Sequence, residues 1–121
     1  MKIDFNKLEE IPNQNYKDGE GVTKIRSYSD GFNKIMLGYL EPGCSIGYHV
    51  QDNSSEVIFI LKGLAHCRFD DEDINLSEGQ CLYCPPGHSH SLGNASSNET
   101  LEYYAVVNSL PDIGLLKSFL L

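Results

Sequence analysis

The residues that first suggest chemistry lie in the stretch GYHVQDNSSEVIFILKG, at positions 47–63. His49, Gln51 and Glu56 carry side chains that can bind a metal ion, and they precede a mostly apolar run. Residues two apart on a strand share a face, so His49 and Gln51 are expected to point the same way. A turn at 52–55 would then bring Glu56 back beside them. The pattern is either a polar turn between two strands or one half of a metal site.

A second polar segment occupies positions 79–94, GQCLYCPPGHSHSLGN. Pro85 and Gly87 are expected to end a strand and turn the chain toward His90. Proline cannot continue a hydrogen-bonded ladder, and glycine adopts the backbone angles that tight turns require. The segment therefore predicts a strand, a turn and a second histidine-bearing strand.

The elements that must hold these side chains are short strands. Apolar runs alternate with clusters of Gly, Pro, Asn, Asp and Ser, and helical periodicity is almost absent. This pattern predicts an all-β antiparallel sandwich or barrel, as a single domain over residues 1–121 with an N-terminal arm at 1–21 and an apolar C-terminal tail at 110–121. Strands are expected at 21–29, 33–41, 45–51, 56–63, 64–71, 73–79, 80–86, 88–94 and 100–108.

The strand at 56–63 predicts burial on both of its faces. If Glu56 points inward, a period of two places Ile58 and Ile60 inward as well. The outward positions are then also apolar, namely Val57, Phe59 and Leu61. Either the N-terminal arm or a second subunit must cover them, and we predict a homodimer.

Composition and charge exclude several classes of partner. Nine basic and seventeen acidic residues give a net charge of −8, which argues against nucleic acid and against anionic membrane surfaces. No run approaches the roughly 18 apolar residues of a membrane-spanning helix. The N-terminus lacks the apolar core of a secretory signal, so a cytoplasmic location is expected.

Four cysteines in a cytoplasmic protein are expected to be reduced. Cys81 and Cys84 form a C-x-x-C pattern that invites a zinc or redox interpretation. However, positions three apart on a strand point to opposite faces, so the two thiols are not expected to share a ligand. We predict four free thiols in or near the core.

Two spacings in the chain resemble the paired motifs of the cupin superfamily. The first motif, at 43–63, carries Gly43, His49, Gln51, Glu56 and Gly63. The second motif, at 79–94, carries Gly79, Pro85, Gly87, His90 and Asn94. The second matches the family pattern at every defining position, whereas the first has Gln51 where the family usually has another histidine. The resemblance implies a small jelly-roll barrel, with His90 reaching the site from the facing part of the barrel.

Carried over by position, the resemblance implies four candidate metal ligands, which are His49, Gln51, Glu56 and His90. Gln51 is a weaker ligand than imidazole, but two histidines and a carboxylate remain without it. That set is associated with non-haem Fe(II) and leaves coordination positions open, and Zn(II), Ni(II) and Mn(II) also accept it. In the alternative, a metal-free barrel, these side chains hydrogen-bond one another. The cost of burying Glu56 without a cation favours the metal.

Three functions remain open at this point. The resemblance implies small-molecule metalloenzymes such as dioxygenases, isomerases and lyases, in which Glu56 would carry a proton as the catalytic residue. The second possibility is a module that binds or senses a small polar molecule without converting it. The third is a metal-free structural dimer. An open coordination sphere favours the enzyme over a closed structural site.

Five further residues receive weaker predictions. His88 is expected to be a solvated turn residue, and His66 to lie on an exposed face without a role. Tyr104 and Glu102 are candidates for a shared inward face. Arg26 is either an anchor for a carboxylate substrate or an ordinary surface residue.

Overall fold

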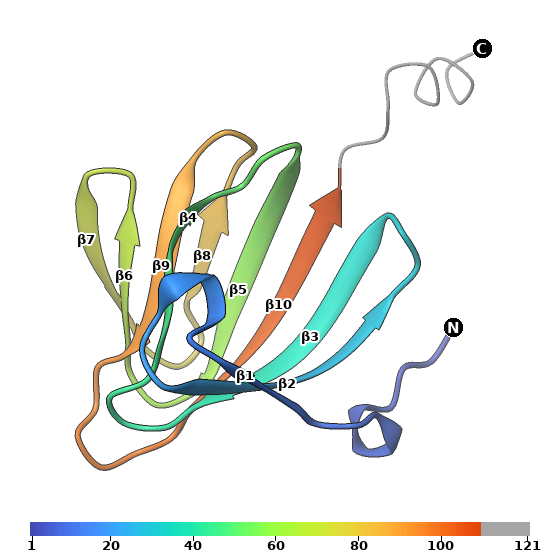
Figure 1. Ribbon diagram of the computed structural model, residues 1–121, viewed down its shortest axis with the longest axis horizontal. Coiled ribbons are helices and arrows are strands. Elements are labelled where there is room, and N and C mark those ends of the chain that lie inside the picture. Colours follow the sequence, from blue (N-terminus) through green and yellow to red (C-terminus); the bar gives the residue numbers. More distant parts are fainter. Residues whose placement is uncertain (110–121) are drawn as a thin grey trace.

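The structure is a computed structural model that describes residues 1–109, so the apolar tail predicted at 110–121 lies outside the described residues (Figure 1). Within residues 1–109, two short 3₁₀ helices and ten strands follow one another: η1 (Phe5–Lys7), β1 (Ile11–Gln14), η2 (Tyr16–Asp18), β2 (Val22–Ser29), β3 (Asn33–Leu40), β4 (Ser45–Val50), β5 (Ser54–Lys62), β6 (Ala65–Phe69), β7 (Glu72–Leu76), β8 (Cys81–Cys84), β9 (Ser89–Asn94) and β10 (Leu101–Ser109).

The strands form two antiparallel sheets that pack as a jelly-roll sandwich. One sheet has the order β1-β2-β3-β10-β5-β8 and the other has the order β4-β9-β6-β7. The chain passes repeatedly from one sheet to the other, because β4 follows β3 in sequence but pairs with β9. The predicted all-β antiparallel architecture is confirmed.

The nine predicted strands correspond to β2–β10, but β1 and η2 were not predicted. Among the described strands, β1 pairs with β2 alone and lies at the edge of the larger sheet. It contains Pro12, which removes a backbone donor and is tolerated at an edge. The polar sequence of the N-terminal arm therefore concealed a strand.

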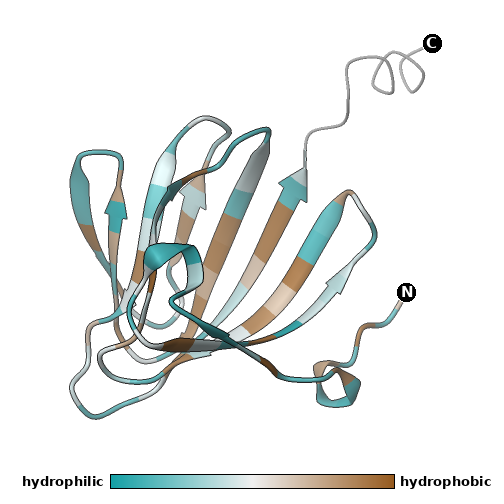
Figure 2. Ribbon diagram, in the orientation of Figure 1, coloured by the Kyte–Doolittle hydropathy of each residue, from teal (hydrophilic) through white to brown (hydrophobic). Residues whose placement is uncertain are grey.

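Alternation along each strand separates the interior from the surface. On β5, Glu56, Ile58 and Ile60 point inward and Phe59 and Leu61 point outward, as the sequence predicted. Phe59 and Leu61 are exposed in the single chain, so the N-terminal arm does not supply the cover that was predicted for them. Figure 2 shows polar residues at the upper ends of β3, β5 and β10 and apolar residues along their middle. The interior is therefore polar at one end and apolar over the rest of its length.

A glycine makes room for the largest side chain of the core. Tyr103 on β10 is 1% exposed and pairs with Gly38 on β3. A Cβ atom at Gly38 would collide with the Tyr103 ring. The space at Gly38 also lets the Tyr103 hydroxyl reach Thr23 Oγ1, at 3.3 Å. Burial raises the pKa of Tyr103, which keeps this phenol neutral.

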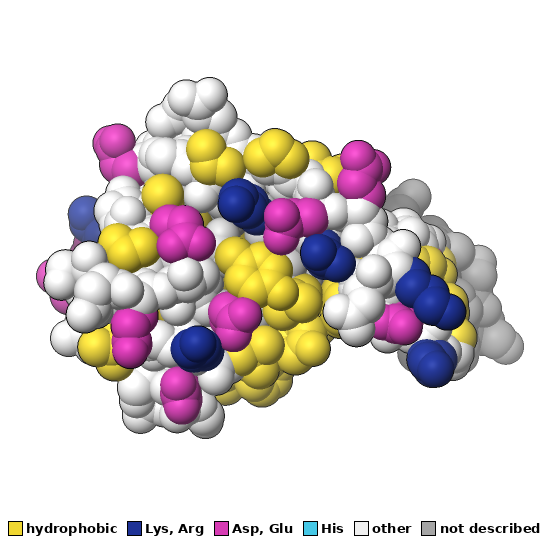
Figure 3. Space-filling model, turned by 90° about the horizontal axis from the view of Figure 1, so that it is seen from below, with side chains coloured by type: hydrophobic (Ala, Val, Ile, Leu, Met, Phe, Trp, Pro, Cys, Tyr) yellow, Lys and Arg dark blue, Asp and Glu magenta, His cyan; other side chains and the backbone are white. Residues whose placement is uncertain are grey.

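The N-terminal arm covers part of the outer face of the larger sheet. The Phe5 ring lies 5.4 Å from the Tyr104 ring, and Arg26 Nη1 donates to the Phe5 carbonyl oxygen at 3.0 Å. Figure 3 shows hydrophobic side chains gathered near the centre of the face seen from below, bordered by acidic and basic ones. Among residues 1–109, no helix has the length and apolar character to span a membrane.

Candidate metal centre

Three of the four predicted ligands meet at the polar end of the interior. His49 on β4 pairs directly with His90 on β9, and their ring centroids are 4.6 Å apart. Glu56 approaches from β5 in the other sheet. One potential ligand atom from each of these residues lies within 4.8 Å of the others, a spacing that could hold a metal ion. The expectation that His90 would face His49 was wrong, because Glu56 is the residue that comes from the opposite sheet.

A bulge in β4 aims the first histidine into the interior. The register between β4 and β9 shifts between Ile46 and His49. Residues three apart on a regular strand point to opposite faces, but an extra residue in one strand restores a common face. Ile46 is buried and His49 lines the cavity, while Tyr48 between them is exposed. Gln51 is buried as well, which confirms the shared face predicted for His49 and Gln51.

The hydrogen bonding of His49 suits a metal ligand. Its Nδ1 donates to the Gly47 carbonyl oxygen at 2.7 Å, which leaves the Nε2 lone pair free. A backbone carbonyl holding one ring nitrogen is the usual way in which proteins orient a metal-binding histidine. Burial lowers the pKa of His49, and the charges of His90 and Lys17 act in the same direction, against the Gly47 carbonyl and Glu56. The imidazole is therefore held in its neutral, ligating form.

His90 and Glu56 form a buried polar pair. His90 Nε2 lies 2.9 Å from Glu56 Oε1 and 3.4 Å from Gln51 Oε1. His90 is 1% exposed, and its Nδ1 has no hydrogen-bond partner among the described residues. The Gln51 amide nitrogen donates to Ser54 Oγ at 3.2 Å, which turns the amide oxygen toward His90. Two nitrogens and two oxygens thus converge, a donor set that accepts a divalent transition metal.

The site opens into a cavity of about 300 Å³. Its apolar wall is formed mainly by Ile25, Met36, Ile46, Ile58, Leu92, Tyr103 and Val107. Tyr16, Lys17 and Lys34 also line it, and sequence reasoning identified none of these three. Lys34 could have been identified because it lies two residues before Met36 on a strand and so shares its inward face. Tyr16 and Lys17 lie in an irregular segment, where no such periodicity applies. Burial raises the pKa of Tyr16, and the charge of Glu56 adds to this effect.

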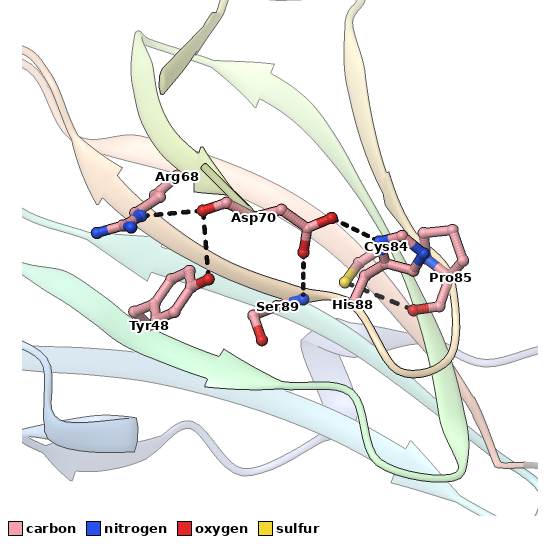
Figure 4. A network of polar contacts seen from close by, with 7 residues as sticks. All are labelled: Tyr48, Arg68, Asp70, Cys84, Pro85, His88 and Ser89. Atoms are coloured by element: carbon pink, nitrogen blue, oxygen red, sulfur yellow. Dashed lines mark hydrogen bonds and ion pairs between the residues drawn. The ribbon is translucent and has the colours of Figure 1, made fainter. Parts of the chain in front are cut away.

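A network of polar contacts braces the turn before His90 (Figure 4). His88 Nδ1 donates to Asp70 Oδ2 at 2.6 Å, and the Ser89 amide donates to Asp70 Oδ1 at 3.1 Å. The Asp70 carbonyl oxygen accepts from Tyr48 and Arg68, at 3.2 and 3.0 Å. The side chain of His88 is 46% exposed, which agrees with a turn residue, but it is fixed by Asp70. The hydrogen bonds to His88 and Ser89 lower the pKa of Asp70.

The remaining predictions have mixed outcomes. Arg26 does not line the cavity, and its Nη1 donates to Phe5 of the N-terminal arm, so it is not placed to anchor a substrate there. Its side chain is half-buried rather than fully exposed. Tyr104 points outward and its neighbour Tyr103 points inward, so the predicted inward face of Tyr104 was wrong. His66 is exposed, as expected, and contacts Asn75 and Asp73.

The four cysteines are free in the structure. Cys67 and Cys84 are buried, Cys44 is half-buried and Cys81 is exposed, so one thiol lies outside the core. Cys81 and Cys84 point to opposite faces of β8, as the sequence predicted. Burial raises the pKa of Cys67 to about 12 and that of Cys84 to about 11, which leaves both thiols protonated and unsuited to metal ligation.

Comparison with known proteins adds sequence and fold relatives. Over 68 residues the chain is 32% identical to an oxalate-binding protein from Thermotoga maritima, and the match covers 56% of this chain and 55% of that protein. The chain therefore spans about half the length of that curated relative. A crystal structure from Thermotoga maritima, described as a predicted oxalate decarboxylase, superposes with a TM-score of 0.84 at 23% identity, covering 91% of this chain and all of the other.

The cupin domain of Cnp3 from Schizosaccharomyces pombe shares the fold at 10% identity, with a TM-score of 0.72 over 94% of this chain and 84% of the other. At such low identity these structures bear on the fold alone. The sequence model of the cupin domain matches residues 36–107, which include both motifs and all four predicted ligands. The chain belongs to the cupin family.

Proposed function

We propose that this protein binds one divalent transition metal through His49, Glu56 and His90, and uses it to hold a small polar molecule for reaction. The observation that supports this most directly is the convergence of the three side chains, within 4.8 Å, at the wall of the cavity. A plugged interior would have favoured a structural role instead. Iron, manganese, nickel and zinc all fit two imidazoles and a carboxylate.

Each residue has a distinct role in the proposed site. His49 and His90 supply neutral nitrogen ligands, and Glu56 supplies the negative charge that offsets part of the cation's charge. Gln51 serves as a weak fourth ligand through the amide oxygen that faces His90. When bound, the metal supplies a Lewis acid that polarises a carbonyl group or activates dioxygen. Glu56 is our proposed catalytic residue, because its carboxylate lines the cavity and lies within hydrogen-bond distance of His90 Nε2, at 2.9 Å.

The proposed ligand carries a carboxylate. The sequence relative is named for binding oxalate, and a chelating carboxylate fits the open positions that a facial set of three ligands leaves. A second candidate function, binding without turnover, is favoured by that relative's name. The two functions share one site and differ in whether the ligand leaves it unchanged.

The test is titration calorimetry of oxalate into the protein with and without Mn(II), followed by NMR analysis of the recovered ligand. We expect binding to the Mn(II)-loaded protein and none to the chelator-treated protein or to Glu56→Gln. Chemical change in the recovered oxalate supports an enzyme, and unchanged oxalate supports a binding module. Equal binding with and without metal would contradict the proposed role of the site.

We further propose a homodimer formed through the outer face of the larger sheet. Phe59, Leu61 and Tyr83 are 47%, 41% and 56% exposed, although all three are large and apolar. The N-terminal arm packs on Tyr104 and leaves these three side chains open. Sedimentation velocity should show a species of twice 13.5 kDa that dissociates in Phe59→Lys. A wild type that sediments only as a monomer would refute this interface.

The cytoplasmic location and the absence of nucleic-acid and membrane partners stay predictions from charge and composition.

A further inference from the structure

The second histidine of the candidate centre lacks the hydrogen bond that orients the first. His49 Nδ1 donates to the Gly47 carbonyl oxygen, whereas His90 Nδ1 is buried and has no hydrogen-bond partner among residues 1–109. Metal-binding histidines are usually oriented by a partner on the ring nitrogen that does not face the metal. The place of the His90 ring must therefore be set by other means, and the backbone that leads into this residue is the nearest candidate.

Asp70 holds that backbone from outside the cavity (Figure 4). It directly follows β6, and its carboxylate accepts from His88 Nδ1 at 2.6 Å and from the Ser89 amide at 3.1 Å. The amide of Asp70 donates to the Ser89 carbonyl oxygen at 2.9 Å. Three hydrogen bonds to one residue thus fix the two residues that precede His90.

Asp70 is itself held by two strands. Its carbonyl oxygen accepts from Tyr48 Oη on β4 and from Arg68 Nε on β6, at 3.2 and 3.0 Å. The residue before it, Phe69, pairs with His90 across the smaller sheet. Asp70 is therefore a fixed point between β4 and β6, and the turn that leads into β9 is positioned against it.

The same turn is also bonded to the segment that carries the other histidine. The Gln51 amide donates to the His88 carbonyl oxygen at 2.8 Å, and the Gly87 amide donates to the Gln51 carbonyl oxygen at 2.7 Å. Gln51 follows β4 directly, two residues after His49. A displacement of the turn would therefore change the separation of the His49 and His90 rings, whose centroids are 4.6 Å apart. Functional sites tolerate displacements of only about 0.5 Å from the geometry that they need.

The exposure of Asp70 separates a role at the metal from a role in folding. Its side chain is 43% exposed, and ion pairs at such positions contribute little to stability. We propose that Asp70 is a positioning residue for the metal centre, and that it sets the place of His90 through its bonds to the turn. This inference rests on the proposed metal function. It gives a role at the metal to a carboxylate that does not line the cavity.

The test uses two variants that remove the contact between Asp70 and His88 from either side. Asp70→Asn keeps one acceptor oxygen, and asparagine tolerates the left-handed backbone of this position, where φ is 49°. His88→Phe cannot donate, but it keeps an aromatic ring against Phe69, whose centroid lies 5.5 Å from that of His88. The matched control is Asp71→Asn, the same change one residue further on, at a fully exposed side chain.

Three measurements separate positioning from folding. Electron paramagnetic resonance gives the Mn(II) affinity, and the visible absorption spectrum of the Co(II)-saturated protein reports the arrangement of the ligands. The urea midpoint of the metal-free protein reports stability. We expect Asp70→Asn and His88→Phe to bind Mn(II) roughly tenfold or more weakly than the wild type, as is typical when a group that orients a metal ligand is lost. Both should also change the Co(II) spectrum, with urea midpoints that move by less than about 0.5 M. Asp71→Asn should match the wild type in all three measurements.

An Mn(II) affinity within about twofold of the wild type, or an unchanged Co(II) spectrum, in either variant would overturn this inference and leave the proposed function standing. A larger fall of the urea midpoint in both variants would assign the contact to folding and would overturn the inference as well. Failure of the wild type to bind Mn(II) or Co(II) would overturn the proposed function together with it.

Discussion

The inward face of β5 changes character along its length, from Glu56 at the cavity to Ile58 and Ile60 in the core. β9 shows the same change, from His90 to Leu92. The same strands thus build a hollow polar end and a filled apolar end, and alternation is unchanged between the two. The difference lies in the residue types at the last inward positions, which leave an open polar cavity at one end and a packed apolar core at the other.

The largest expected effect comes from emptying the apolar end. Leu101 is fully buried, so Leu101→Ala should lower the free energy of unfolding by about 2–5 kcal/mol through lost burial and a cavity. Urea denaturation measures this loss. Leu64→Ala, at a site that is 50% exposed, should change stability by less than about 0.5 kcal/mol.

The affinity of the folded Leu101→Ala protein for Mn(II) should match that of the wild type. A parallel fall in metal affinity and stability would show that the two ends are coupled, and the division described above would then fail.

A smaller effect is expected from changing the weakest ligand at the polar end. Gln51→His replaces an amide oxygen with an imidazole and should tighten Mn(II) binding by an order of magnitude, about 1.4 kcal/mol. The matched control is Gln80→His, since Gln80 is exposed outside the cavity and its side-chain oxygen accepts from the Ser77 amide. Competition with a chelator measures both affinities. An unchanged affinity in Gln51→His would mean that position 51 does not face the metal.

The sequence predicted the sandwich, and the convergence of His49, Glu56 and His90, for a physical reason. Period-two alternation on β5, and the spacing from His49 to Glu56, are local properties that survive in the folded chain. The arrangement of the strands in the two sheets depends on contacts between distant segments, which local patterns do not reveal. For this reason His90 was expected in the sheet opposite His49, whereas the two histidines are neighbours on the paired strands β4 and β9.

The features that sequence reasoning missed depend on contacts between distant segments. η2 has no periodicity, and its position depends on Gly47, where the absence of a side chain lets the Lys17 carbonyl approach. Tyr103 was not distinguished from Tyr104 because both faces of β10 carry apolar residues, and only the space at Gly38 reveals which ring is buried.

The smallest expected effect concerns a turn outside the interior. Asp30 accepts hydrogen bonds from the amides of Phe32 and Asn33, at 2.9 and 2.8 Å, and these bonds lower its pKa below 3.8. A lowered pKa stabilises the fold at pH values above the unfolded pKa, and this contribution disappears as the pH falls through the folded pKa.

Asp30→Asn should therefore reduce stability slightly at pH 7 and less so below pH 3.8. The measurement is the urea denaturation midpoint of each protein at pH 7 and at a pH below 3.8. Asp71→Asn, at an exposed position, is the control. If Asp30→Asn lost more stability below pH 3.8 than at pH 7, the assigned role of the Asp30 carboxylate would be contradicted.

The most direct test of the account is metal content by elemental analysis, on protein purified without a histidine tag and dialysed with Fe(II), Mn(II), Ni(II) or Zn(II). The variants are His49→Ala, Glu56→Gln and His90→Ala, with His66→Ala as the control because His66 is exposed outside the cavity. We predict close to one metal ion per chain in the wild type and in His66→Ala, and little in the other three. A wild type that takes up none of the four metals, or equal metal in Glu56→Gln, would contradict the central claim that these side chains form a metal centre.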